Sequence, residues 1–253
     1  MRRFLVEVQY NGKNYGGWQR NDNANTIQNV VETALKKLFS SEITAEGCSR
    51  TDAGVSAKQY FFHFDADTKL PCERVCYKLN RFLPSDVVCQ SSVEVDKRFH
   101  ARKNVISKTY VYRFYCGEHQ KPLINRDAFF AKGRFDESEA AKACALFVGR
   151  HDFSAFRTDS SSKASPIKTV FAARIDGFPD YFGFTVVADG FLYNMVRIMA
   201  GTVIAVGQGK IALSDVQTAL NGGRRIESAL TLPPKGLTLE KVDYGNTGEF
   251  IVK

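Results

Sequence analysis

Apolar residues occupy every second position near the start of the chain, at Phe4, Val6, Val8 and Tyr10. This alternation predicts a β-strand over residues 4–10. Over residues 27–38, apolar side chains recur instead with the helical period of about 3.6 residues, which predicts a helix. Asn25 and Gln28 resemble a capping box at its start. Similar patterns predict strands near 43–48, 59–65 and 86–95, with a helix at about 72–82.

A second cycle of strands and helices begins near residue 105. Residues 106–115 are rich in β-branched and aromatic side chains and predict a long strand, and Asp136 with Glu139 caps a predicted helix. The later pattern predicts strands near 168–176 and 181–188, helices at about 191–206 and 214–221, and a final pair of strands. The serine run at 160–162 predicts a loop. We expect an α+β protein of two halves, residues 1–104 and 105–253.

The chain has an excess of basic residues, which bears on the kind of partner it binds. The 253 residues include 35 Lys and Arg against 27 Asp and Glu, a formal net charge of +8. Such an excess favours nucleic acid over a membrane surface as the partner, because cationic side chains neutralise phosphates. Many basic proteins bind no polyanion, so charge alone leaves both interpretations open.

Several classes of protein lack their usual sequence signs. No run of about 18 apolar residues is present, so we expect no membrane span. The six cysteines form no Cys-x-x-Cys pair, and the four histidines show no zinc spacing. Neither a Gly-x-x-x-x-Gly-Lys loop nor a Gly-x-Ser-x-Gly elbow occurs. We therefore expect a cytoplasmic protein with reduced cysteines, no metal, no cofactor, and neither ATP-dependent nor acyl-transfer chemistry.

The segment Arg50-Thr51-Asp52-Ala53-Gly54 is the strongest candidate for chemistry. Its carboxylate follows a cation and precedes small residues, so a flat ligand could approach it. Asp and Gly are also favoured where a chain reverses direction. As an isolated motif, the segment therefore fits a structural turn as well as an active-site carboxylate.

Arg197 lies in the middle of the predicted helix 191–206, which is apolar nearly all round. A guanidinium stays charged, so its burial requires a hydrogen-bonded anionic partner. One interpretation is that Arg197 reaches solvent or pairs with an arbitrary acid. The other is that it pairs with Asp52 and keeps that carboxylate ionised.

Two tyrosines share one face of the predicted strand at 106–115. Lys108, Tyr110 and Tyr112 are spaced two residues apart, so their side chains lie on the same side of a sheet. Aromatic platforms beside basic residues suit base stacking and phosphate contact. The alternative is that both tyrosines belong to the core of a half-buried sheet.

A basic run at 97–103 lies between the predicted halves and contains Phe99-His100-Ala101-Arg102. It fits either a segment along an RNA path or a solvated connector. The dipeptide His151-Asp152 is a weaker candidate, because adjacent side chains do not face each other. We expect structural hydrogen bonds from it.

Six segments together resemble one family. Arg50-Thr51-Asp52-Ala53-Gly54-Val55 resembles the signature of the TruA-type tRNA pseudouridine synthases. The supporting segments follow in the family's order: Tyr10-Asn11-Gly12 with Gly17-Trp18-Gln19-Arg20, Phe99-His100-Ala101-Arg102, Tyr110-Val111-Tyr112, Gly149-Arg150-His151-Asp152-Phe153 and Met195-Val196-Arg197. The resemblance implies a pseudouridine synthase fold, with two halves similar to RNA-recognition-motif or ferredoxin-like domains and a central antiparallel sheet.

The resemblance also implies an activity, the isomerisation of uridine to pseudouridine at positions 38–40 of the tRNA anticodon stem-loop. Asp52 would be the catalytic carboxylate, acting on the base or the sugar. Tyr110 would pack on the target base, Arg197 would hold Asp52 ionised, and Arg50 would fill the space left by the flipped base. Further RNA contacts would come from three basic residues, Arg20, Arg102 and Lys108. A homodimer that binds tRNA across both subunits is implied as well.

The chain departs from the family pattern at three places near these residues. One is Tyr193-Asn194, which stands before Met195 where the family commonly has paired histidines. Ser56 stands where the family usually has His, and Lys108 where it usually has Arg, which loses bidentate phosphate geometry. Two other functions remain open. A catalytically silent RNA-binding module would gain nothing from Asp52, and a carboxylate-dependent hydrolase would need a second acid, for which no motif is apparent.

Overall fold

The computed structural model describes residues 1–158, 165–222, 224–246 and 249–252. The chain divides into two compact units: unit 1 comprises Met1–Ile106 with Leu239–Lys253, and unit 2 comprises Ser107–Thr238. The C-terminal residues group with unit 1 rather than with the second half, because strand β10 (Leu237–Asp243) lies beside β3 (Ser56–Ala66). The predicted loop at 160–162 lies outside the described residues.

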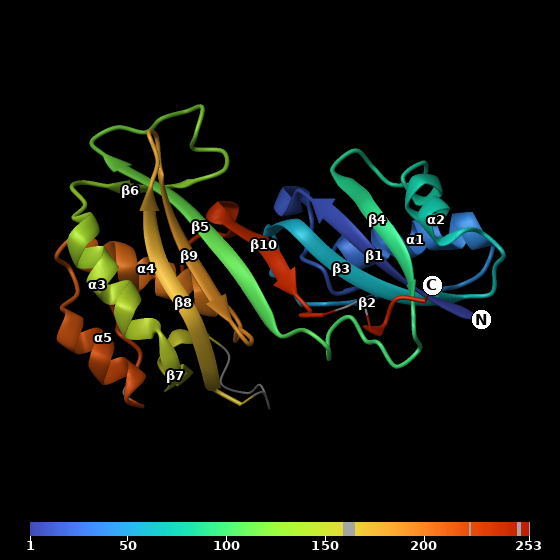
Figure 1. Cartoon of the computed structure of the whole chain (residues 1–253). Coiled ribbons are helices and arrows are strands. Elements are labelled where there is room, and N and C mark those ends of the chain that lie inside the picture. The colour runs from blue at the N-terminus through green and yellow to red at the C-terminus, as the bar shows by residue number, and fades with distance from the viewer. Residues whose placement is uncertain (159–164, 223, 247–248, 253) are drawn as a thin grey trace. The chain divides into compact units, whose positions relative to one another are not determined.

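Unit 1 is built on an antiparallel sheet in which β1 (Arg2–Tyr10) lies between β4 (Val87–Val95) and β3 (Figure 1). The short strand β2 (Glu46–Gly47) pairs with β3. Helix α2 (Cys72–Leu79) packs against β4 and contacts α1 (Ile27–Phe39), and a 3-10 turn, η1, spans Gly12–Asn14. The predicted order of elements in this half is therefore confirmed.

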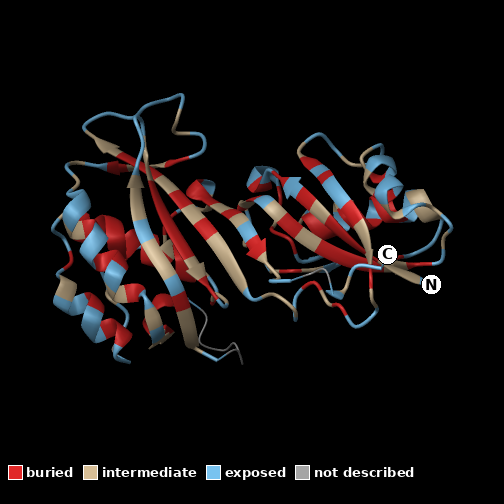
Figure 2. Ribbon diagram, in the orientation of Figure 1, coloured by how far each residue is buried: buried red, intermediate tan, exposed pale blue. Residues whose placement is uncertain are grey.

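The alternation near the N-terminus produces a half-buried strand. Phe4, Val6 and Val8 are fully buried, whereas Gln9 is exposed (Figure 2). The rings of Phe4 and Phe64 stack at 5.3 Å between centroids, so the apolar face of β1 continues onto β3. This packing is the core that supports the loops at the ends of both strands.

The start of α1 differs by one residue from the expected cap. Thr26, not Asn25, is the N-cap, and its Oγ1 accepts a hydrogen bond from Asn29 N–H at 3.4 Å. The capping box predicted from Asn25 and Gln28 is therefore wrong. Gln28 lies on the buried side of the helix, where its side chain has other partners.

The strands of unit 2 include four that are hydrogen-bonded neighbours in the order β5-β9-β8-β7, and each of these pairs is antiparallel. Its strands are β5 (Ser107–Gly117), β6 (Phe129–Lys132), β7 (Gly149–Asp152), β8 (Ile167–Gly177) and β9 (Phe182–Ala188). Its helices are α3 (Glu137–Phe147), α4 (Met195–Gly207), α5 (Leu213–Leu220), and the 3-10 turns η2 (Ser154–Phe156) and η3 (Pro234–Gly236). Strand β6 pairs in parallel with β5. Helix α4 contacts β5 and β9, and α3 contacts both α4 and β8.

Three predictions about unit 2 and the tail need correction. Strands β6 and β7, of four residues each, were missed because such short runs carry too little periodicity to be recognised. Helix α4 begins at Met195 instead of near 191, because Asn194 adopts a left-handed conformation with φ of 60°. In the described part of the tail, β10 is followed only by an isolated bridge between Val95 and Ile251, not by a second strand.

The fold agrees with the predicted class at the level of a mixed α and β protein with a mostly antiparallel sheet. Among the described residues, no helix combines the length and the apolar character that crossing a bilayer requires.

Candidate active site

Asp52 lies in a tight turn that leads into β3. Val55 N–H donates to Asp52 O at 3.1 Å, and Gly54 takes a left-handed φ of 79°. The Asp52 side chain is half-buried, next to the buried Thr51. The segment is thus a turn, as residue preferences predict, and the same turn presents a partly accessible carboxylate. The two interpretations of the motif are compatible.

Residues 15–18 hold this turn through the backbone. Trp18 N–H donates to Thr51 O at 3.2 Å, and Gly54 N–H donates to Tyr15 O at 3.0 Å. Gly17 has a φ of 89°, and a Cβ atom there would collide with the carbonyl oxygen of Thr51. The opening motif of the chain therefore supports the Asp52 turn through a close approach that only glycine permits.

Buried side chains of β1 and β3 also hold the Asp52 turn in place. The Tyr10 and Thr51 hydroxyl groups form a buried hydrogen bond of 2.8 Å. Tyr60 Oη donates to the carbonyl oxygen of Ser49, and the Tyr60 ring stacks on Trp18 at 4.2 Å between centroids. Because these rings belong to the core of unit 1, the turn is fixed to a rigid sheet.

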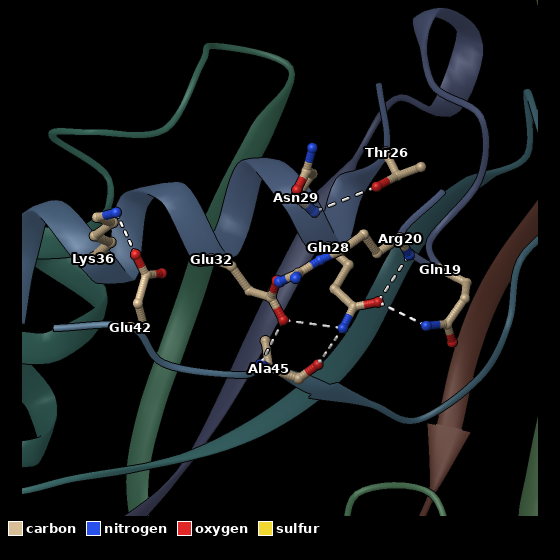
Figure 3. A network of polar contacts seen from close by, with 9 residues as sticks. All are labelled: Gln19, Arg20, Thr26, Gln28, Asn29, Glu32, Lys36, Glu42 and Ala45. Atoms are coloured by element: carbon tan, nitrogen blue, oxygen red, sulfur yellow. Dashed lines mark hydrogen bonds and ion pairs between the residues drawn. The ribbon is translucent and has the colours of Figure 1, made fainter. Parts of the chain in front are cut away.

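Two residues of α1 are buried and polar, which the sequence did not predict. Gln28 Oε1 accepts a hydrogen bond from Arg20 N–H at 2.9 Å, and Glu32 forms an ion pair with the Arg20 side chain (Figure 3). Both interrupt the apolar face of the predicted helix four residues apart, but this pattern alone does not predict that they are buried. Arg20, expected to contact RNA, is about half exposed and carries this buried acid as a partner.

The basic run at 97–103 is a well-anchored segment of unit 1. Arg3 donates to Lys97 O at 2.7 Å and to Phe99 O at 2.8 Å, and Ala101 N–H donates to His63 Nδ1 at 3.2 Å. Phe99 and Ala101 are buried, whereas the four cations of the run are exposed: Lys97, Arg98, Arg102 and Lys103. A solvated connector would not need these anchors, so the geometry favours a presented cationic surface. Arg50 is exposed as well.

Tyr110 lies on β5 in unit 2 and is buried. It contacts Phe191 edge to face, with 5.1 Å between ring centroids and an interplanar angle of 84°. Tyr112 is fully buried, and its hydroxyl donates to Pro233 O at 2.8 Å. Burial raises the pKa of Tyr112 well above its usual value. Tyr112 is therefore a core residue, while Lys108 on the same strand is half-buried.

Arg197 is the third residue of α4 rather than a mid-helix residue. The other residues of this helix are buried, but Arg197 is half-buried. Its Nε donates to Leu232 O and its Nη1 to Asn194 Oδ1, each at 2.6 Å. The left-handed Asn194 thus ends the preceding segment and also orients the guanidinium.

The candidate residues fall into two groups. Asp52 and Arg50 belong to unit 1, whereas Tyr110 and Arg197 belong to unit 2. Each group is held on a sheet or helix of its own unit. The pairing of Arg197 with Asp52 stays a prediction.

Other reactive side chains are poorly suited to catalysis. Burial raises the pKa of Cys116 to about 11 and that of Cys144 to about 12, so both thiols are protonated at neutral pH. His151 bonds to Val148 O at 3.0 Å and Asp152 accepts from Ser154 N–H at 2.7 Å, which confirms their structural role. In the described ranges, no three His, Cys, Asp or Glu residues gather as metal ligands would.

Comparison with known proteins identifies the family of this chain. A family model described as tRNA pseudouridine synthase matches residues 143–245. The tRNA pseudouridine synthase A of Thermoanaerobacter sp. (strain X514) is 39% identical over 244 residues, which cover 96% of this chain and 100% of that protein. The proteins of the same name from Acetivibrio thermocellus and Staphylococcus aureus (strain JH1) are 36% and 34% identical, each over 96% of this chain and over 100% and 95% of their own lengths. With this extent of identity along nearly its whole length, the chain belongs to the tRNA pseudouridine synthase A family.

Proposed function

We propose that this protein isomerises uridine to pseudouridine in tRNA, at positions 38–40 of the anticodon stem-loop. The observation that carries the proposal is the half-buried Asp52 on a turn fixed to the unit 1 core, in a chain that matches its relatives over 96% of its length. A carboxylate that acts on one atom of a substrate has to be held in place, and this turn satisfies that need.

The reaction needs no redox step or energy source. The glycosidic bond breaks, the uracil ring rotates, and C5 bonds to the sugar carbon that N1 has left. The C5 proton is lost and N1 gains one, so atoms balance within the substrate and solvent. Asp52 acts on the base or on the sugar in the bond-breaking step. A target base that is stacked in a stem has to be flipped out first, which costs a few kcal/mol.

The roles of the other residues follow from their chemistry. Tyr110, which is only 6% exposed beside Phe191, packs on the target base. Arg197, oriented by Leu232 and Asn194, pairs with Asp52 and keeps it ionised. Arg50 fills the gap that the flipped base leaves. Arg102, Lys108 and Arg20 contact the RNA backbone.

Two further features belong to the proposal. Each unit corresponds to one ferredoxin-like half, and the protein acts in the cytoplasm as a homodimer that binds tRNA across both subunits. Ser56, which replaces a histidine of the family pattern, keeps a structural use here, because its Oγ accepts a hydrogen bond from Gly12 N–H at 3.1 Å.

The test is incubation of the protein with a tRNA transcript, followed by mapping of pseudouridine in the anticodon arm. Asp52→Asn should abolish product while the dissociation constant for tRNA stays within about threefold, since binding does not need the charge. Asp67→Asn, at a side chain 94% exposed, is the matched control and should keep full activity. Turnover by Asp52→Asn would refute the role of Asp52. Binding by the wild-type protein without any product would favour the silent RNA-binding module.

A further inference from the structure

Helix α1 carries two polar side chains on the face it buries. Gln28 is 7% exposed and Glu32 is 6% exposed, while their neighbours on that face, Ile27, Val31 and Leu35, are fully buried. Burying an amide and a carboxylate is unfavourable unless both are hydrogen-bonded. Their presence in the core therefore indicates that specific partners hold them there.

Gln28 uses its full capacity for hydrogen bonds. Its Oε1 accepts from Arg20 N–H at 2.9 Å and from Gln19 Nε2 at 3.0 Å. Its Nε2 donates to Glu32 Oε1 at 3.0 Å and to Ala45 O at 3.2 Å. Figure 3 shows this amide at the centre of the network, between the helix and the segment that contains Arg20.

Glu32 links the remaining members of the network. Its Oε1 also accepts from Ala45 N–H at 3.0 Å, and its Oε2 pairs with the guanidinium of Arg20. Both the backbone and the side chain of Arg20 are therefore tied to α1. A buried network is rigid where its members are hydrogen-bonded, and the amide of Gln28 has all four of its hydrogen bonds.

Two successive backbone hydrogen bonds connect the start of α1 to the Asp52 turn. At the start of α1, Ile27 N–H donates to Gly17 O at 3.1 Å and Gln28 N–H donates to Trp18 O at 3.0 Å. Trp18 N–H in turn donates to Thr51 O, next to Asp52. Residues 17–20 thus lie between α1 and the turn, and they touch both.

We propose that Gln28 and Glu32 are positioning residues for catalysis, because they hold residues 17–20 in the one arrangement that fixes the Asp52 turn. The inference rests on the proposed function of Asp52. Neither residue needs to touch the substrate. Catalytic geometry tolerates displacements of only about 0.5 Å, and a misplacement of about 1 Å can cost about 100-fold in rate.

The test compares Gln28→Leu with Val31→Ala. The first change removes four hydrogen bonds at nearly constant volume, whereas the second removes only apolar contacts from the same buried face. Both proteins are assayed with a tRNA transcript at a temperature at which circular dichroism shows them folded. Gln28→Leu should lower kcat about 100-fold with KM within about threefold, and Val31→Ala should keep kcat within about threefold.

A second readout does not depend on catalysis. Trp18 is the single tryptophan of the chain, is 2% exposed, and lies inside the supporting segment. Acrylamide quenching of its fluorescence should increase in Gln28→Leu and not in Val31→Ala. If the wild-type protein makes no pseudouridine, the proposed function fails, yet the quenching still tests whether the network holds residues 17–20.

Glu32→Gln covers the case in which Gln28→Leu does not fold. It removes the charge opposite Arg20 but keeps an amide oxygen for Ala45, so kcat should fall about 10-fold, with increased quenching of Trp18. Where both single variants fold, the variant that carries both substitutions should have the same kcat as Gln28→Leu alone, because both substitutions disrupt the same network. Wild-type kcat in Gln28→Leu or Glu32→Gln, or an equal loss of kcat in Val31→Ala, would overturn the proposal.

Discussion

His63 should make the stability of this protein depend on pH between about 4 and 6.5. The side chain is 4% exposed on β3, and its Nδ1 accepts the hydrogen bond from Ala101 N–H at 3.2 Å. Burial, followed by the nearby charges of Arg3 and His100, lowers the pKa of His63 to about 4, and Asp65 opposes this only in part. Protonation would remove the acceptor and place a cation beside the Arg3 guanidinium.

The sign and the size follow from linkage. The unfolded chain binds a proton at this residue with a pKa of about 6.5, whereas the folded chain does so only near 4. The stabilising contribution is therefore complete above pH 6.5 and is lost as pH falls toward 4. The difference between the two pKa values amounts to a loss of about 2 kcal/mol at pH 5. For a domain that is stable by about 5–15 kcal/mol, a loss of this size is easily measured.

The assay is urea denaturation of the wild-type protein and of His63→Asn at intervals between pH 5 and pH 7.5. The amide side chain introduced by this substitution offers a neutral acceptor and does not titrate, so the free energy of unfolding should lose most of its slope in this range. His119→Asn, at an exposed histidine, is the control and should keep the wild-type slope. Equal slopes for the wild-type protein and His63→Asn would refute the reasoning.

Three further changes test other parts of the structure. Gly17→Ala should lower kcat about 100-fold, because the added Cβ would displace the Thr51 carbonyl next to Asp52. Gly209 also has a positive φ but has open space around it, so the control Gly209→Ala should lower stability and leave kcat unchanged. Arg197→Lys should lose at least about 10-fold in kcat, because an ammonium cannot keep both orienting hydrogen bonds, and unchanged steady-state kinetics would mean that Arg197 only packs. Charge reversal at the exposed lysines of the 97–103 run should weaken tRNA binding and flatten its salt dependence, and an unaltered salt slope would place this run away from the RNA.

Local sequence patterns predicted most of the secondary structure. Alternation of apolar and polar residues identified β1 although Leu5, on the opposite face, is buried too, and the helical period identified α1. The same reasoning failed where a single backbone conformation decides the outcome. The left-handed Asn194 moves the start of α4 to Met195, and this places Arg197 in the first turn of the helix instead of its middle.

The same distinction applies to the candidate site, where some residues could be predicted from the sequence and others could not. Asp52 could be singled out from the residues around it and from the family motif, since both are properties of a short segment. Gln28 and Glu32 could not, because a polar residue on an apolar helix face predicts burial only once its partners are known. Those partners, Arg20 and Ala45, are brought to the helix by loops that leave no periodic signal.

The sequence by itself predicted the long strands and helices, the basic character of the chain, and Asp52 as the candidate carboxylate, because periodicity, charge and short motifs are local. Only the tertiary structure decided which contacts hold that carboxylate. Gly17 and Trp18 meet Thr51 although they lie far from it along the chain, and a buried network on α1 fixes them there. Such contacts depend on how the sheet and the helix pack, and no stretch of the sequence contains them.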